Sequence, residues 1–156
     1  WSSDVCSSDL RFNASRHTSS AFLQCAFVQS SFFDARFDGC KLTGSWFDRC
    51  TFTSFAVEGG DWSFVGLAGA DLGKASFVGS RLREADLTGV KAVGATLRDC
   101  DLTGAWLHNA DLTRADLRGS DLATVDPSVV SMAGAQVRWQ QAVQIATSLG
   151  LDVVDE

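Results

Sequence analysis

A strict five-residue period runs through the chain from Phe12 to Leu122. Of the 23 positions at every fifth residue from Phe12, 19 are Phe or Leu. Of the 22 positions two residues earlier, 19 are Ala, Ser, Cys or Gly. Amphipathic helices repeat at about 3.6 residues and half-buried strands at about two, so neither explains this pattern. The pattern is explained by a backbone that turns a corner every five residues. Each side between two corners then places one large and one small side chain inward.

Four such sides close one coil, and successive coils stack at strand spacing, about 4.8 Å. Phe or Leu fills the narrow interior, and the small residue two positions earlier prevents overpacking. Glycine recurs two positions after the centre, where the chain turns. We therefore predict an all-β fold, a right-handed quadrilateral parallel β-helix with a short C-terminal α-helix.

Three segments are expected along the chain. Residues 1–10 resemble a translated sequencing adapter and are expected to be non-native. Residues 11–126 form the β-helix, and residues 127–156 form a cap that begins at Pro127. A helix is predicted over 138–149, and its apolar stripe either only covers the last coil or in addition joins two copies of the chain. The stripe consists of Trp139, Ala142, Val143, Ala146 and Leu149.

Two departures from the plain repeat carry further expectations. The segment from Phe55 to Gly66 breaks the small-residue rule twice, so a locally distorted coil is expected there. Four cysteines hold inward small positions: Cys25, Cys40, Cys50 and Cys100. Because no CxxC spacing occurs, we expect them to be buried thiols that pack as small apolar groups, not metal ligands or disulfides.

No residue cluster predicts catalysis. His17 is expected to point inward and His108 outward, and neither has a nucleophile at a recognisable spacing. Eight aspartates fall one residue before a centre, where the repeat itself supplies them, and no phosphate-binding glycine loop occurs. We expect no enzyme activity, no cofactor and no metal. No apolar run approaches a membrane span, so a cytoplasmic protein without membrane contact is expected.

Function is expected on the outward residues, because the inward ones are committed to packing. Residues 56–156 carry eight basic and 14 acidic side chains, against five basic and three acidic in residues 11–55. The acidic half is either a solvated surface or a surface that competes with nucleic acid for a basic groove. A pure acidic stripe is not expected, because Asp101 and Asp121 share a side with Lys41 and Arg81. Outward Trp46 and Trp106 share another side.

Several segments resemble the A(D/N)LXX motif of the pentapeptide-repeat family, including ADLTG at residues 85–89 and ADLRG at 115–119. The resemblance covers residues 12–126. The C-terminal part, with its break at residues 125–127 and QAV at 141–143, is similar to the MfpA-like members of this family, which are related to the Qnr proteins.

This resemblance implies a DNA-mimicking homodimer, joined through the C-terminal helix by the apolar stripe named above. It implies binding to DNA gyrase, a type II topoisomerase, which the protein would inhibit or protect, as in quinolone resistance. The protein would not bind nucleic acid itself. The alternative is an interaction scaffold with an unrelated protein target. The acidic binding surface would comprise Asp86, Asp101, Asp111, Asp116, Asp121 and Asp126.

Overall fold

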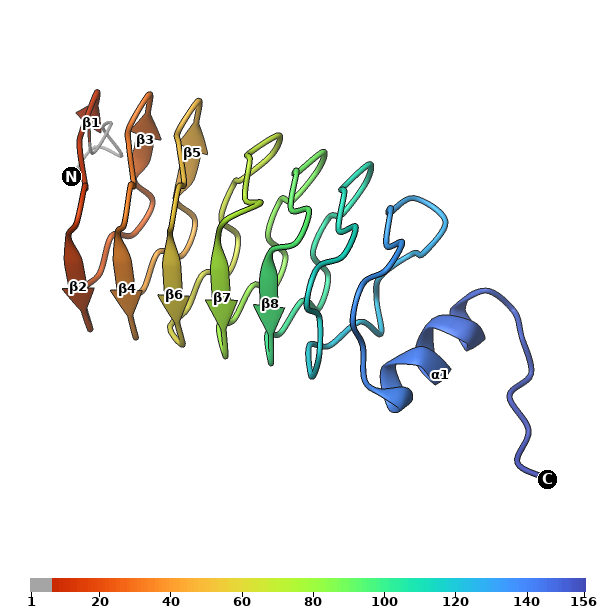
Figure 1. The fold of residues 1–156 in the computed structure, drawn as a ribbon. Coiled ribbons are helices and arrows are strands. Elements are labelled where there is room, and N and C mark those ends of the chain that lie inside the picture. Colours follow the sequence, from red (N-terminus) through yellow and green to blue (C-terminus); the bar gives the residue numbers. More distant parts are fainter. Residues whose placement is uncertain (1–6) are drawn as a thin grey trace.

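The computed structural model describes residues 7–156 as a stack of coils that ends in one helix (Figure 1). Paired residues are twenty positions apart, as in His17 opposite Phe37 and Phe37 opposite Val57. All strand pairs are parallel within the described residues. The repeat therefore makes about six coils at strand spacing. The parallel β-helix that the period predicts is confirmed.

Regular strands occupy two of the four sides. One side holds β2 (Arg16–Thr18), β4 (Arg36–Asp38), β6 (Ala56–Glu58), β7 (Ser76–Val78) and β8 (Thr96–Arg98). Another holds β1 (Ser7–Ser8), β3 (Ala26–Val28) and β5 (Trp46–Asp48). The remaining sides are joined by isolated parallel bridges, such as Lys41 to Asp61.

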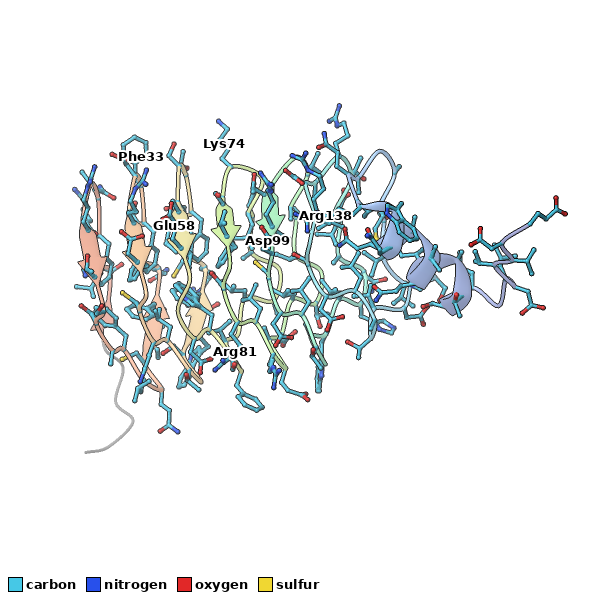
Figure 2. All side chains as sticks on the ribbon, turned by 90° about the horizontal axis from the view of Figure 1, so that it is seen from below. Phe33, Glu58, Lys74, Arg81, Asp99 and Arg138 are labelled. Atoms are coloured by element: carbon cyan, nitrogen blue, oxygen red, sulfur yellow. The ribbon has the colours of Figure 1, made fainter. Side chains whose placement is uncertain are left out.

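We name the four sides by their first segment and its equivalents every twenty residues. Wall A starts at residues 11–14, wall B at 16–19, wall C at 21–24 and wall D at 26–29. Phe33 and Lys74 of wall A project on the opposite side of the rod from Arg81 of wall C (Figure 2).

The interior follows the predicted packing rule. The centres Leu102 and Leu112 are fully buried, and the inward small residues Cys100 and Ala110 are buried with them. In the N-terminal coils the centres are phenylalanines whose rings stack from coil to coil, as Phe32 does on Phe52 at 5.3 Å between ring centroids. Chemically different side chains of the right size therefore fill one continuous column.

Cys25 departs from the sequence expectation. It is disulfide-bonded, so the prediction of a free thiol is wrong at this position. The other three cysteines of the described residues, Cys40, Cys50 and Cys100, are free. The five-residue period places each sulfur inward, but the period says nothing about its oxidation.

The coil around Phe55 opens a seam on wall A. This wall pairs up to Thr51 and again from Asp71 onward, but no bridge joins these two residues in the described chain. The backbone N–H groups of Phe52, Ser54 and Asp71 have no acceptor among residues 7–156. Phe55 is buried in an inward position that alanine occupies in both neighbouring coils, so its ring takes up space between them.

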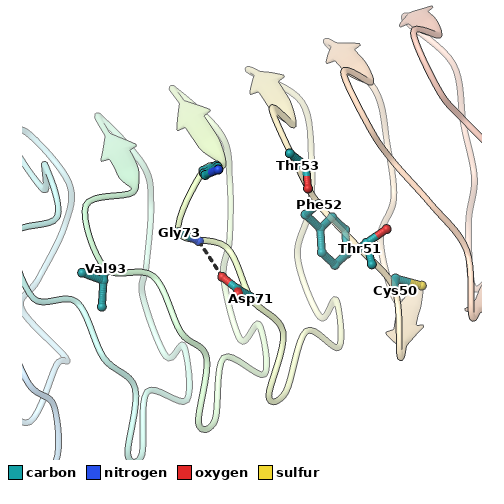
Figure 3. A pocket seen from close by; sticks show the side chains of 8 residues that line it. Cys50, Thr51, Phe52, Thr53, Asp71, Gly73 and Val93 are labelled. Carbon is teal, nitrogen blue, oxygen red and sulfur yellow. Dashed lines mark hydrogen bonds between the residues drawn. The ribbon is translucent and has the colours of Figure 1, made fainter.

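The expected distortion is therefore next to Phe55 and not throughout 55–66, where walls B, C and D remain paired. A shallow pocket lies over the seam, with the carboxylate of Asp71 turned onto the N–H of Gly73 at 3.1 Å (Figure 3). Its lining residues are Cys50, Thr51, Phe52, Thr53, Asp71, Gly73, Lys74 and Val93.

Helix α1 (Trp139–Ser148) closes the C-terminal end of the rod, within one residue of the predicted bounds at each end. Its inward side chain is Gln141, which is buried. Gln141 Nε2 donates to the carbonyls of Leu117 and Ser120, both at 2.8 Å, and Oε1 accepts from the N–H of Gly119 at 3.1 Å. One amide thus pairs backbone groups that a further coil would otherwise pair, which covers an open strand edge.

The apolar stripe predicted on α1 is only partly buried. Trp139 and Leu149 are 73% and 57% exposed, Ala142 is exposed, and Val143 and Ala146 are half-buried. Contact with the core comes from Ile145, beside the stripe, and Gln141 supplies the hydrogen-bonding groups that the coil edge requires.

Candidate macromolecule-binding surface

Eight aspartates of the repeat share one local geometry. In each, carboxylate Oδ1 accepts a hydrogen bond from the backbone N–H two residues on, at 2.9 to 3.2 Å. This contact satisfies a turn amide that no coil neighbour pairs, and it fixes the side-chain direction. The eight are Asp61, Asp71, Asp86, Asp101, Asp111, Asp116, Asp121 and Asp126.

The same contacts keep several of these groups ionised. The Thr103 hydroxyl, Oγ1, donates to Asp101 at 2.6 Å, and with Arg83 it lowers the pKa of Asp101 to about 2. Hydrogen bonding by Thr113 lowers the pKa of Asp111 below its ordinary value. These carboxylates are therefore fixed anions at neutral pH.

The structure distributes the six predicted acidic residues over all four walls. Asp86 and Asp126 belong to wall D, Asp101 and Asp121 to wall C, Asp111 to wall A and Asp116 to wall B. They are not gathered into one patch, because five-residue sides place consecutive repeats on consecutive walls.

Ion pairs divide these residues into two groups. Asp101 pairs with Arg83 on wall C, and Asp116 with Arg118 at 2.8 Å on wall B. Lys41 and Arg81 share wall C with the acids, as the spacing predicts. The other four have no ion-pair partner within residues 7–156: Asp86, Asp111, Asp121 and Asp126.

Wall D combines unpaired carboxylates with exposed tryptophans. Trp46 and Trp106 are 44% and 64% exposed and lie on this wall as predicted. Gly66 lies between them in the stack, and a Cβ there would come within 2.9 Å of the Cβ of Trp46. Sequence reasoning identified the tryptophans but missed the glycine whose absent side chain makes room for one of them.

Three of the five predicted dimerisation residues, Trp139, Ala142 and Leu149, are exposed on α1, and exposed Leu151 and Val153 follow them in the tail. The structure therefore leaves an apolar surface at the C-terminal end, most of it on the predicted stripe.

The titratable groups of the interior are poor nucleophiles or bases. His17 stacks on Phe37 at 4.7 Å between ring centroids, and burial lowers its pKa. Burial raises the pKa of Cys100 to about 11.

Residues 7–156 contain no group of three side chains placed to hold a metal. None of the helices in the described chain is long and apolar enough to cross a membrane.

A sequence profile of a known family matches the part of the chain where this repeat is most regular. A profile for pentapeptide repeats matches residues 67–104 and 97–125, with eight copies. Residues 67–125 are therefore pentapeptide repeats. Among curated proteins, the sequence has no significant match.

Two solved structures of QnrB1, a plasmid-mediated fluoroquinolone resistance protein, resemble this chain. A trypsin-treated QnrB1 variant has a TM-score of 0.51 at 20% identity, covering 94% of this chain and 86% of the other. Full-length QnrB1 has a TM-score of 0.50 at 17% identity, covering 93% and 99%. At this identity the likeness establishes the fold alone.

Proposed function

We propose that this chain is a non-enzymatic, cytoplasmic DNA mimic that binds DNA gyrase and modulates or protects it. The observation that carries the proposal is the set of turn-locked carboxylates in the C-terminal half. The sequence resemblance to MfpA-like proteins supports this target, and the fold is one that QnrB1, a fluoroquinolone resistance protein, also has.

Fixed anions on a stiff rod present what a DNA-binding groove recognises without base readout. Equivalent carboxylates on one wall repeat in steps of the coil spacing, about 4.8 Å, and DNA carries one phosphate per about 3.4 Å of each strand. The turn contacts hold the carboxylates in place before binding, so little side-chain entropy is lost on association.

We further propose that two copies join through the exposed stripe of α1, so that their acidic halves meet at the centre of a longer rod. Trp139 and Leu149 supply the largest exposed apolar groups of this stripe. Analytical ultracentrifugation of the wild-type protein and of Trp139→Ala tests this proposal. We expect the wild-type protein to sediment as a dimer and the variant as a monomer. A wild-type protein that stays monomeric at high concentration contradicts the proposal.

The main test is a gyrase supercoiling assay over a range of salt concentrations. A variant with Asp→Asn at the four aspartates that lack ion pairs (Asp86, Asp111, Asp121 and Asp126) keeps the turn acceptor, because the Asn side-chain oxygen can replace Oδ1. Its effect on gyrase is expected to fall at least tenfold, with a shallower salt dependence. Asp116→Asn, at an ion-paired site, is the matched control. A wild-type protein without effect at any concentration refutes the proposal.

A second candidate is an interaction scaffold with another protein target. On wall C, Lys41 and Arg81 alternate with aspartates, which favours this candidate. A surface that imitates DNA should be negative, and these two cations reduce the negative charge of the wall. The scaffold predicts no change in supercoiling, together with binding to some protein that does not bind DNA.

A further inference from the structure

Wall D ends in a rung that nothing occupies. Within the stack, Trp106 N–H donates to the Ala85 carbonyl at 2.9 Å, and the Trp106 carbonyl accepts from Leu87 N–H at 2.8 Å. The equivalent groups one coil further on are the Ala105 carbonyl and the Leu107 N–H. Within residues 7–156, neither has a hydrogen-bond partner. They lie two residues apart in the chain and belong to the same edge, the arrangement by which a parallel strand is received.

The chain itself does not fill this rung at the point where Pro127 ends the repeat. Asp126 accepts from the N–H of Ser128 at 2.9 Å, as the other repeat aspartates do at their turns, but it has no bridge to Trp106. Pairing resumes with Asn109 N–H on the Val129 carbonyl at 2.8 Å. That bond spans twenty residues, whereas the equivalent bond from Gly89 to His108 spans nineteen. The slip of one residue leaves the edge at residues 105–107 uncovered.

A pocket of about 400 Å³ occupies this gap between the open edge and the last turn. On the edge side, Trp106 is 64% exposed and Leu107 buried. The full lining comprises Thr88, Ala105, Trp106, Leu107, His108, Thr124, Val125, Asp126 and Val129. The pocket thus has a mixed apolar and polar lining, an indole at its rim and two unpaired backbone groups.

Charge defines what the pocket can accept. Asp126 lines it together with His108, the one other titratable side chain of the lining, and Asp86 lies next to Trp106 in the stack. Neither carboxylate has an ion-pair partner in the described part of the chain. The one Lys or Arg of wall D in residues 7–156 is Arg49, which pairs with Asp48. The surface therefore complements a cation and repels an acidic segment.

We propose that this gap is a docking site for an extended, arginine- or lysine-bearing peptide segment of a partner protein. One residue of the segment completes the rung: its N–H donates to the Ala105 carbonyl, and its carbonyl accepts from Leu107 N–H. Its cationic side chain lies over the indole of Trp106 and reaches Asp126. The site does not depend on the proposed action on gyrase.

Amide NMR titration with blocked seven-residue peptides tests the proposal. The probe peptide carries a central Arg flanked by Val and Thr. Two matched peptides differ at the central residue only: one carries Glu, and the other carries Arg with a methylated backbone nitrogen. We expect saturable shifts of the Leu107 and Trp106 amides with the Arg probe. Binding should be at least tenfold weaker for each matched peptide, because one loses the charge match and the other the backbone donor.

Variants locate the site. Trp106→Ala and Asp126→Asn are expected to weaken the Arg probe several-fold; the first side chain is exposed and the second substitution keeps the turn acceptor, so folding is preserved. Trp46→Ala, on the same wall three coils away, is the matched control and should bind like wild type. Equal affinity for the N-methylated peptide refutes the strand pairing. Equal affinity for the Glu peptide refutes the charge match, and unshifted Leu107 and Trp106 amides refute the site.

Discussion

The two halves of the rod fill the same column with different side chains. Residues 11–55 stack phenylalanine rings, with Ser and Cys at most inward small positions, whereas residues 71–126 use mainly Leu with Ala. The halves also differ in charge, with an acidic excess only in the second. The family profile matches within 67–125, where the Ala-Asp-Leu pattern is regular. Coil geometry therefore depends on the alternation of large and small volumes and not on one motif.

The comparison is tested most severely in the interior. Leu102→Ala is expected to lower the free energy of unfolding by about 3–5 kcal/mol, because Leu102 is fully buried in a column one side chain wide. Phe32→Leu places in the N-terminal half the residue that fills most centres of the C-terminal half. It should lower the free energy of unfolding by less, about 1–2 kcal/mol. Chemical denaturation followed by circular dichroism measures both. An equal loss for the two variants would mean that the halves are not interchangeable.

Removing the terminal amide is the next largest change. Gln141→Ala leaves the carbonyls of Leu117 and Ser120 and the N–H of Gly119 without their present partner, so a loss of about 2–3 kcal/mol is expected. Hydrogen exchange at Gly119 should accelerate. Exposed Gln140→Ala on the same helix is the control and should be close to neutral. Unchanged exchange at Gly119 would contradict the capping role.

The seam between the halves is tested by removing its wedge. Phe55→Ala matches the alanines at this position in the adjacent coils and is expected to let wall A pair across Thr51 and Asp71. Amide exchange at Phe52 and Asp71 should then slow at least tenfold, although the new hydrogen bonds offset only part of the about 3–5 kcal/mol that losing a buried ring costs. Faster exchange at both amides would show that the ring holds the coils together instead of separating them.

The smallest effect concerns acid stability of the C-terminal half. Because the pKa of Asp101 is lowered to about 2 in the folded state, its contribution is complete above its ordinary pKa and is lost as pH falls toward 2. Asp101→Asn should flatten the decline of the urea midpoint between about pH 4 and 2. Asp48→Asn, an exposed N-terminal control, should leave the decline unchanged. A wild-type midpoint that is independent of pH in this range would contradict the assignment.

The sequence predicts the column and the side that each residue faces, because volume at fixed offsets leaves one way to pack. It does not predict features that depend on a single local event. Gln141 lies beside an apolar stripe that looks like a cap, although the coil edge requires hydrogen bonds. The open rung at Leu107 follows from a slip of one residue after Pro127, and the proline was its only signal. The disulfide at Cys25 lies outside any packing rule.

Sides of five residues also govern how such a protein can change length. Deleting one quintet upstream returns every later Leu and Ala to the interior, but it rotates everything downstream by a quarter turn. If the quintet is lost between Lys41 and Asp101, Asp101 leaves the side of Lys41 and joins the side of Arg36. The gain or loss of a single repeat therefore changes which outward residues share a side, while the packing of the interior is kept. Only insertions or deletions of twenty residues, or multiples of twenty, leave every side with its original residues in line.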